Sequence, residues 1–270
     1  MSSNGTFPPD APPFPAPAGI LPGEALRELS RAAGILEGKS FALRMASLAG
    51  APIEALKARL PQPIQGSLDR LVRRALAAAA RAALASGPGR AGWTTSGWLH
   101  RGLAAASGVA GGAFGLPGTL VELPGTTTLL LRQIAVIAAE EGESLSDPAS
   151  AAECLKVFAL GSREPDGSPE RTDYFTTRVA LTEALRSAVS GGLAGVLMPG
   201  FIGAISARFA GPVALKLSAQ AAPFLGAAAG AAVNLAFLEH FRSVARAHFT
   251  VRRLERQYGA EPVRRAYDAM

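Results

Sequence analysis

The run FLGAAAGAAVNLAFLEHFRSVARAHFTVRRLERQ, residues 224–257, is the longest helical pattern in this chain of 270 residues. Its bulky side chains recur at intervals of four and three residues: Phe237, Phe241, Val244, His248 and Val251. This spacing places them on one face of a helix, where they can pack against the rest of the protein. Gly259 ends the pattern, and Pro262 opens a short terminal helix. We therefore predict one long helix that presents a packing face to its neighbours.

Upstream of this run the helical period begins at Gly23, and no segment alternates apolar and polar residues as a half-buried strand does. A stripe of apolar residues marks the first helix: Leu26, Leu29, Ala33 and Leu36. Further helices are expected at 123–142, 148–160 and 171–190. The sequence thus predicts an all-α fold, a compact Gly- and Ala-rich bundle of about seven to nine helices over residues 23–270.

Residues 65–85 form an amphipathic helix with a basic side. The apolar side carries Leu68, Leu71, Val72, Ala75, Leu76 and Ala79. The opposite arc, roughly a third of the helix circumference, carries Arg70, Arg73, Arg74 and Arg81. The long C-terminal helix adds Arg242, Arg246, Arg253 and Arg256. We expect these eight arginines to make one surface that faces an anionic membrane, and the alternative is a solvated face with intrahelical ion pairs.

The formal net charge is +6, and it is unevenly placed along the chain. Residues 139–173 carry nine acidic and three basic residues, whereas residues 240–270 carry three acidic and seven basic ones. A molecule polarised in this way can orient on an anionic lipid surface. Nucleic acid is not an expected partner, because base-stacking aromatics and a recognition motif are missing.

Residues 1–22 contain seven prolines and no basic residue, which predicts a disordered leader and not a secretory signal. Cys154 is the single cysteine, so no disulfide can form within the chain, and a reducing compartment is expected. Its apolar neighbours should raise the pKa of its thiol.

Three windows lack charged residues: 102–121, 187–207 and 217–238. Their length suits a bilayer span, but their Gly, Pro and Ala content makes insertion marginal. In the alternative, these windows form closely packed helices at the centre of the domain, because glycines four residues apart let helix backbones approach each other.

A polar cluster is expected from Glu122, Thr126, Thr127, Arg132 and Asn234. Glu122 lies between apolar stretches, where a buried carboxylate needs a partner, and Arg132 is the nearest basic residue. Thr126, Thr127 and Thr128 are expected to cap a helix N-terminus, with binding of an anion as the alternative. Asn234 should hydrogen-bond a neighbouring helix. The pair of Glu122 and Arg132 is either structural or functional, as a proton sensor or a holder of a polar head group.

No metal and no cofactor is expected. Gly38-Lys39-Ser40 imitates the end of a P-loop, but no strand precedes it. His240 and His248 are eight residues apart, without the HExxH spacing of zinc proteases, and we expect His248 to be a hydrogen-bonded core residue. No catalytic residue follows from these patterns.

The run ELPGTTTLLLRQIAVIAAEEGESLSDPASAAECLKVFALG, from Glu122 to Gly161, resembles the EcsC protein family. An acidic-Leu-Pro entry, paired threonines, an Arg-containing apolar helix and a later ECLxVFALG-like helix recur in that family. The stretch from Phe224 to Val263 is similar to the family's closing segment, so the resemblance extends from about residue 23 to the C-terminus.

The resemblance implies an all-helical, Gly-rich, membrane-associated bacterial protein. The family is named after the third gene of an operon that also encodes an ABC transporter, and it supplies no catalytic residues. We therefore expect a non-enzymatic protein at the cytoplasmic face of the membrane, or in the cytoplasm. Its expected partners are anionic lipid and a membrane protein such as an ABC transporter. The alternatives are a helical hydrolase with a buried Glu122 site and a soluble transporter partner.

Overall fold

The computed structural model of the chain describes residues 21–38, 41–50, 60–86, 123–162, 174–186, 199–220 and 226–270, together with residues 52, 55 and 58. Within these ranges all regular secondary structure is helical, and none of these residues lies in a β-strand. The prediction of an all-α fold is confirmed. The predicted leader lies outside the described residues except for Leu21 and Pro22, and Leu21 is already buried in the core.

The helices are α1 (Gly23–Leu36), α2 (Phe41–Ala49), α4 (Gln62–Gln65), α5 (Leu68–Ser86), α7 (Pro148–Leu160), α8 (Tyr174–Arg186), α9 (Pro199–Gln220), α10 (Gly226–Tyr258) and α11 (Ala260–Asp268). Residues 123–140 are also helical. With this segment the described part of the chain has ten helices, slightly more than the expected seven to nine.

Local sequence signals explain several helix boundaries. Asp147 is the N-cap of α7, and its side chain accepts a 2.9 Å hydrogen bond from the amide of Ala149. Gly259 separates α10 from α11 with a φ of 93°, a left-handed conformation that favours glycine. The predicted stripe of the first helix is right for Leu29, Ala33 and Leu36, whereas Leu26 is 39% exposed, because α1 buries the neighbouring Ala25 instead.

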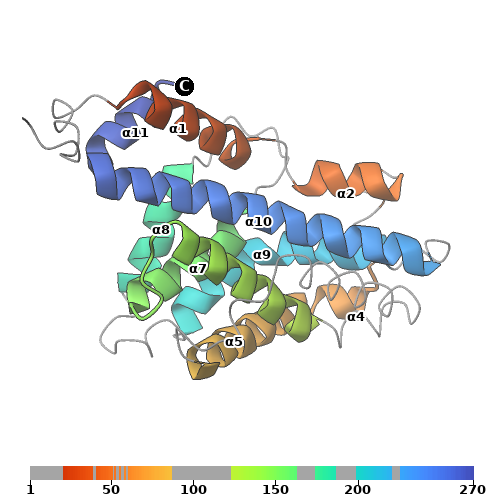
Figure 1. The fold of residues 1–270 in the computed structure, drawn as a ribbon. Coiled ribbons are helices and arrows are strands. Elements are labelled where there is room, and N and C mark those ends of the chain that lie inside the picture. Colours follow the sequence, from red (N-terminus) through yellow and green to blue (C-terminus); the bar gives the residue numbers. More distant parts are fainter. Residues whose placement is uncertain are drawn as a thin grey trace, which may run out of the picture.

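The two longest helices organise the bundle (Figure 1). α10 has 33 residues and packs against α1, α2, α7, α9 and α11. α9 packs against α2, α5, α7, α8 and α10. In Figure 1, α1 and α11 lie on the upper side of α10, whereas α5 lies at the lower edge of the molecule, beyond α9.

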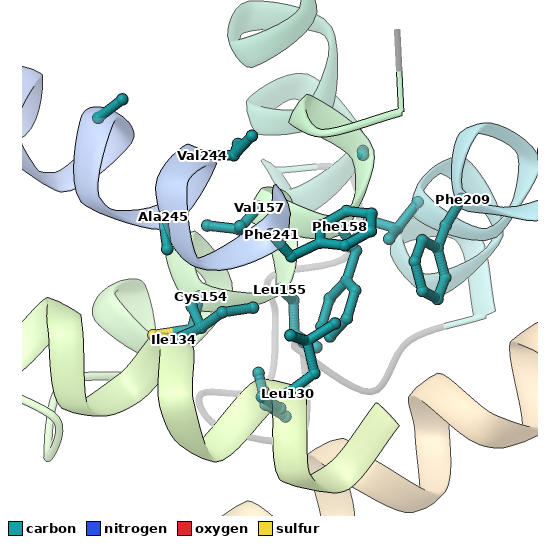
Figure 2. Close-up of a cluster of buried hydrophobic side chains, with 14 of the residues drawn as sticks. Leu130, Ile134, Cys154, Leu155, Val157, Phe158, Phe209, Phe241, Val244 and Ala245 are labelled. Atoms are coloured by element: carbon teal, nitrogen blue, oxygen red, sulfur yellow. The ribbon is translucent and has the colours of Figure 1, made fainter. Parts of the chain in front are cut away.

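Phenylalanine rings fill the centre between these helices. Phe158 of α7, Phe209 of α9 and Phe241 of α10 are all fully buried. The ring centroids of Phe158 and Phe209 are 4.8 Å apart, and those of Phe209 and Phe241 are 5.4 Å apart in edge-to-face geometry. Figure 2 shows these rings packed near Leu130 and Ile134 of the helix at 123–140.

The sequence windows did not identify α9 as one helix. Arg208 and Lys216 lie between two charge-free windows, so the windows each cover only part of this helix, whereas α9 runs unbroken through both charges and through Pro212. The 21 residues Pro199–Ala219 are long and apolar enough to cross a membrane, but 61% of an 18-residue stretch within them is buried inside the molecule. Window 102–121 lies outside the described residues.

Gly161, at the C-terminal end of α7, tests how tightly this centre is packed. A Cβ atom at Gly161 would lie 2.6 Å from Cε1 of Phe241, a ring that its neighbours hold in place. Gly161→Ala should therefore lower the free energy of unfolding by about 1–3 kcal/mol through overpacking. Urea unfolding of the purified protein measures this change.

Gly125→Ala is the matched control, because a Cβ atom at this helical position would meet nothing within 4 Å. It should be neutral or stabilising by up to about 1 kcal/mol. Equal destabilisation by both substitutions would show that the close contact with Phe241 is unimportant.

Candidate functional site

A chain of buried polar side chains joins α7, α8 and α10. Lys156 Nζ donates to Glu153 Oε1 at 2.9 Å, and Glu153 Oε2 lies 3.1 Å from His248 Nε2. His248 Nδ1 is in turn 2.8 Å from the hydroxyl oxygen of Tyr174. We call Lys156, Glu153, His248 and Tyr174 the buried polar chain, and all four residues are buried.

The protonation of the buried polar chain follows from its neighbours. Burial alone would raise the pKa of Glu153, but the hydrogen bond with His248 and the charges of Lys156 and Arg252 hold that pKa well below its ordinary value. The ionised carboxylate can only accept hydrogen bonds, so His248 Nε2 carries a proton and donates to it. Burial lowers the pKa of His248 and raises that of Tyr174. A neutral His248 then accepts the hydroxyl hydrogen of Tyr174 at Nδ1.

The prediction that His248 is a hydrogen-bonded core residue is confirmed, because both of its ring nitrogens have partners. Burial also raises the pKa of the Cys154 thiol, as expected from its apolar neighbours. Among the described residues no three His, Cys, Asp or Glu side chains are grouped to hold a metal ion.

A second set of ion pairs extends from the buried polar chain to the surface. Arg252 of α10 lies 3.4 Å from Glu153 and donates to Glu143 at 2.7 Å through Nε. Glu143 also pairs with Arg256. The hydrogen bonds from Arg252 and Ser150 outweigh its burial and lower the pKa of Glu143. The acidic segment after the helix at 123–140 is thus bound to α10.

The arginines predicted on α10 do not form a free basic surface. Arg253 pairs with Glu141 at 2.8 Å and with Glu28 at 2.7 Å. Arg246 lies 3.4 Å from Glu140, and Arg242 lies 2.9 Å from Glu239. Since Arg256 pairs with Glu143, every predicted arginine of α10 has a carboxylate partner. Carboxylates of the acidic segment 139–173 thus neutralise arginines of the basic segment 240–270 along α10. This finding corrects the expectation that all eight arginines form one surface.

The arginines of α5 have a different environment. Arg70, Arg74 and Arg81 are exposed and form no ion pair with a described carboxylate. Arg73 donates to Asp69 at 2.7 Å, and Asp69 accepts a hydrogen bond from Ser206 of α9, so Arg73 belongs to the contact between these helices. We call Arg70, Arg74 and Arg81 the α5 arginine row. At 100° per residue they fall within about 40° of arc.

The polar cluster expected around Glu122 is only partly described. Glu122 itself lies outside the described residues. Arg132 lies in the helix at 123–140, and its buried Nε has no hydrogen-bond partner in the described part of the chain. Asn234 is buried in α10, as expected.

Thr127 does not cap the helix at 123–140. It donates to the carbonyl of Leu123 at 2.8 Å, and Thr128 donates in the same way to Pro124. The capping prediction is therefore wrong for these two residues, because both lie four residues after a helical carbonyl that accepts their hydroxyl hydrogens. Thr126 is buried in the same turn.

A pocket lies beside the buried polar chain. It has a volume of about 460 Å³ and is formed by α8, the end of α10 and the start of α11. Thr182 lines it and accepts a 2.8 Å hydrogen bond from Lys156, so the buried polar chain ends at the pocket wall. Arg178 and Glu255 also line it and form a bidentate pair at 2.8 and 2.7 Å.

His248 is the only member of the buried polar chain that the sequence patterns identify. Glu153 and Lys156 stand three residues apart in an otherwise apolar helix, and these opposite charges on an apolar face were a usable signal. The contribution of Tyr174 comes from tertiary packing, which no local pattern reports.

Removal of Lys156 should be costly, because it leaves the carboxylate of Glu153 short of a partner in the interior. Lys156→Ala is expected to lower the free energy of unfolding by about 3–5 kcal/mol. The exposed pair of Arg246 and Glu140 provides the control, and Arg246→Ala should cost less than about 1 kcal/mol. Chemical denaturation compares the two variants, and similar small losses would mean that Lys156 is not buried as described.

His248 should make the protein sensitive to acid. The unfolded chain binds a proton on this histidine below its ordinary pKa of 6.5, whereas the folded chain keeps it neutral. Protons therefore favour unfolding, and stability should fall as the pH decreases from 7 to 5. The slope contributed by His248 is at most about 1.4 kcal/mol per pH unit. Urea unfolding at several pH values measures it.

His248→Gln keeps a donor and an acceptor but cannot titrate, so it should reduce this slope. Burial lowers the pKa of His240 as well, so a residual slope is expected. An unchanged slope in His248→Gln would disprove the assignment to His248.

The EcsC protein family matches residues 41–254, which include the whole of α5, α7, α8 and α9. No curated protein and no solved structure matches the chain. The matched range contains the α5 arginine row and all four residues of the buried polar chain. Because the match covers most of its length, the chain belongs to the EcsC protein family.

Proposed function

We propose that this protein is a non-enzymatic, membrane-associated member of its family that binds anionic lipid through the α5 arginine row. The buried polar chain holds the helices together in this proposal and performs no reaction. The protein works at the cytoplasmic face of the membrane, as a peripheral component of a transporter or another membrane process.

The observation that supports the proposal is the contrast between the two groups of arginines. The predicted arginines of α10 form ion pairs with carboxylates of the protein itself. The α5 arginine row is exposed and forms no ion pair with a described carboxylate. The other side of α5 is anchored, because Val72, Ala75 and Leu76 are fully buried. The helix therefore presents its guanidinium groups from a rigid support.

The strength expected for this contact is modest. A basic side chain near an anionic leaflet contributes about 1 kcal/mol, so the three arginines contribute about 3 kcal/mol. This energy suits reversible binding and decreases with added salt. A membrane protein such as an ABC transporter is the alternative partner, and co-purification without lipid would identify it.

Charge reversal of the row tests the proposal. The triple variant Arg70→Glu, Arg74→Glu and Arg81→Glu should bind vesicles with phosphatidylglycerol at least about 100-fold more weakly than the wild type. Vesicle co-sedimentation at low and high salt measures the affinity, and salt should weaken binding of the wild type.

The control reverses three exposed arginines elsewhere, Arg27, Arg31 and Arg265, and so changes the net charge equally. It should retain most of the binding. Equal losses in both triple variants would point to net charge alone, and strong pelleting with phosphatidylcholine vesicles at high salt would exclude an electrostatic mechanism.

A further inference from the structure

The pocket formed by α8, α10 and α11 has the features of a binding site separate from the α5 arginine row. Its volume of about 460 Å³ lies within the range of small-molecule sites, about 300–1,000 Å³. The bidentate pair of Arg178 and Glu255 has side chains that are 17% and 13% exposed. This pair is part of the pocket lining and is held rigidly by two parallel hydrogen bonds.

The pocket also has cationic groups with unused hydrogen-bonding capacity. Arg186 is 77% exposed in its side chain and approaches Glu183 only to 3.9 Å. Arg264 lies 3.7 Å from Asp268, while its guanidinium stacks 5.6 Å from the ring centroid of Phe175. Because these contacts are long, both guanidinium groups can still donate two parallel hydrogen bonds to a ligand. The ring of Phe175 orients the guanidinium of Arg264.

Carboxylates balance these cations in the lining. Glu183 and Glu261 have side chains that are 72% and 74% exposed, and among the described residues each has one long ion pair, with Arg186 at 3.9 Å and with Arg265 at 3.8 Å. With Glu255 they offset the three arginines of the pocket, so its lining is neutral overall. The carboxylates would repel a ligand that carries only negative charge, and the arginines would repel a ligand that carries only positive charge. A ligand with both charges satisfies both groups.

We propose that this pocket binds a small zwitterion with a phosphate ester and a primary ammonium group, the chemistry of ethanolamine phosphate. The phosphate is held by Arg186 and Arg264, which match its oxygens in bidentate geometry. The ammonium donates hydrogen bonds to Glu183 and Glu261, and its two-carbon linker lies against the exposed Val179. The ligand is either the head group of an ethanolamine lipid or a free phosphoethanolamine.

Calorimetric titration of the full chain with phosphoethanolamine tests the site. Saturable binding is expected, and the double variant Arg186→Gln with Arg264→Gln should weaken it at least about tenfold. Arg246→Gln is the matched control, because Arg246 is an exposed arginine of α10 that pairs with Glu140 and does not line the pocket, and it should bind like the wild type.

Two further probes test the need for both charges. Phosphocholine, whose quaternary ammonium cannot donate a hydrogen bond, and inorganic phosphate, which has no ammonium, should each bind at least about tenfold more weakly. Absence of saturable phosphoethanolamine binding would overturn the site. Equal binding of all three probes, or no effect of the double variant, would overturn the proposed recognition.

The source of the ligand is found by flotation with vesicles of phosphatidylethanolamine and phosphatidylcholine at high salt, where the α5 arginine row is screened. Binding that depends on phosphatidylethanolamine and on Arg264 identifies a lipid head group. Binding of soluble phosphoethanolamine alone identifies a free ligand. Either result leaves the test of the α5 arginine row unchanged, because that test uses phosphatidylglycerol and different variants.

Discussion

The carboxylate of Glu153 is the contact that constrains the packing of α7, α8 and α10. It is 8% exposed and stays ionised, and such a charge is tolerated in an interior only with several partners close by. Lys156 reaches it from the same helix, and His248 and Arg252 reach it from α10. Because Lys156 also donates to Thr182 and His248 is joined to Tyr174, α8 is bound to the same centre. A shift of α10 by one turn would remove His248 and Arg252 from Glu153, and a shift of α8 would remove a hydrogen-bond partner from Lys156 and from His248.

Ion pairs within the protein also determine how much of its charge is exposed to solvent. A chain with an acidic segment and a later basic segment looks polarised when it is read linearly, but here the two segments lie side by side. Glu140, Glu141 and Glu143 take up arginines that would otherwise face solvent along α10. The net charge of +6 therefore overstates the basic surface of this region. The α5 arginine row stands out because no carboxylate lies three or four residues from any of its members along the helix.

Periodicity predicted most of the fold because it reports burial directly. The helix at 148–160 was expected with the bounds it has, since Asp147 and Pro148 mark its start by side-chain chemistry alone. The sequence pattern divides α9, because Arg208 and Lys216 lie at the ends of two charge-free windows. Lys216 is fully buried, with its ammonium 5.4 Å from the ring centroid of Phe237 in α10, and no local sequence pattern reports this contact between helices. Apart from His248, the sequence does not predict the buried polar chain, because its three helices, α7, α8 and α10, meet only in the folded protein.

The burial of Lys216 also bears on how the protein would meet a membrane. α9 has the length of a bilayer span, but five helices pack around it and two charged side chains lie within it. To enter lipid, α9 would have to leave the phenylalanine cluster and carry Lys216 away from Phe237, and a basic residue at the centre of a spanning helix costs about 3 kcal/mol or more. Peripheral binding requires neither change, because the α5 arginine row is already exposed on the folded bundle. The proposal therefore assigns membrane contact to α5 and leaves α9 as the central packing element.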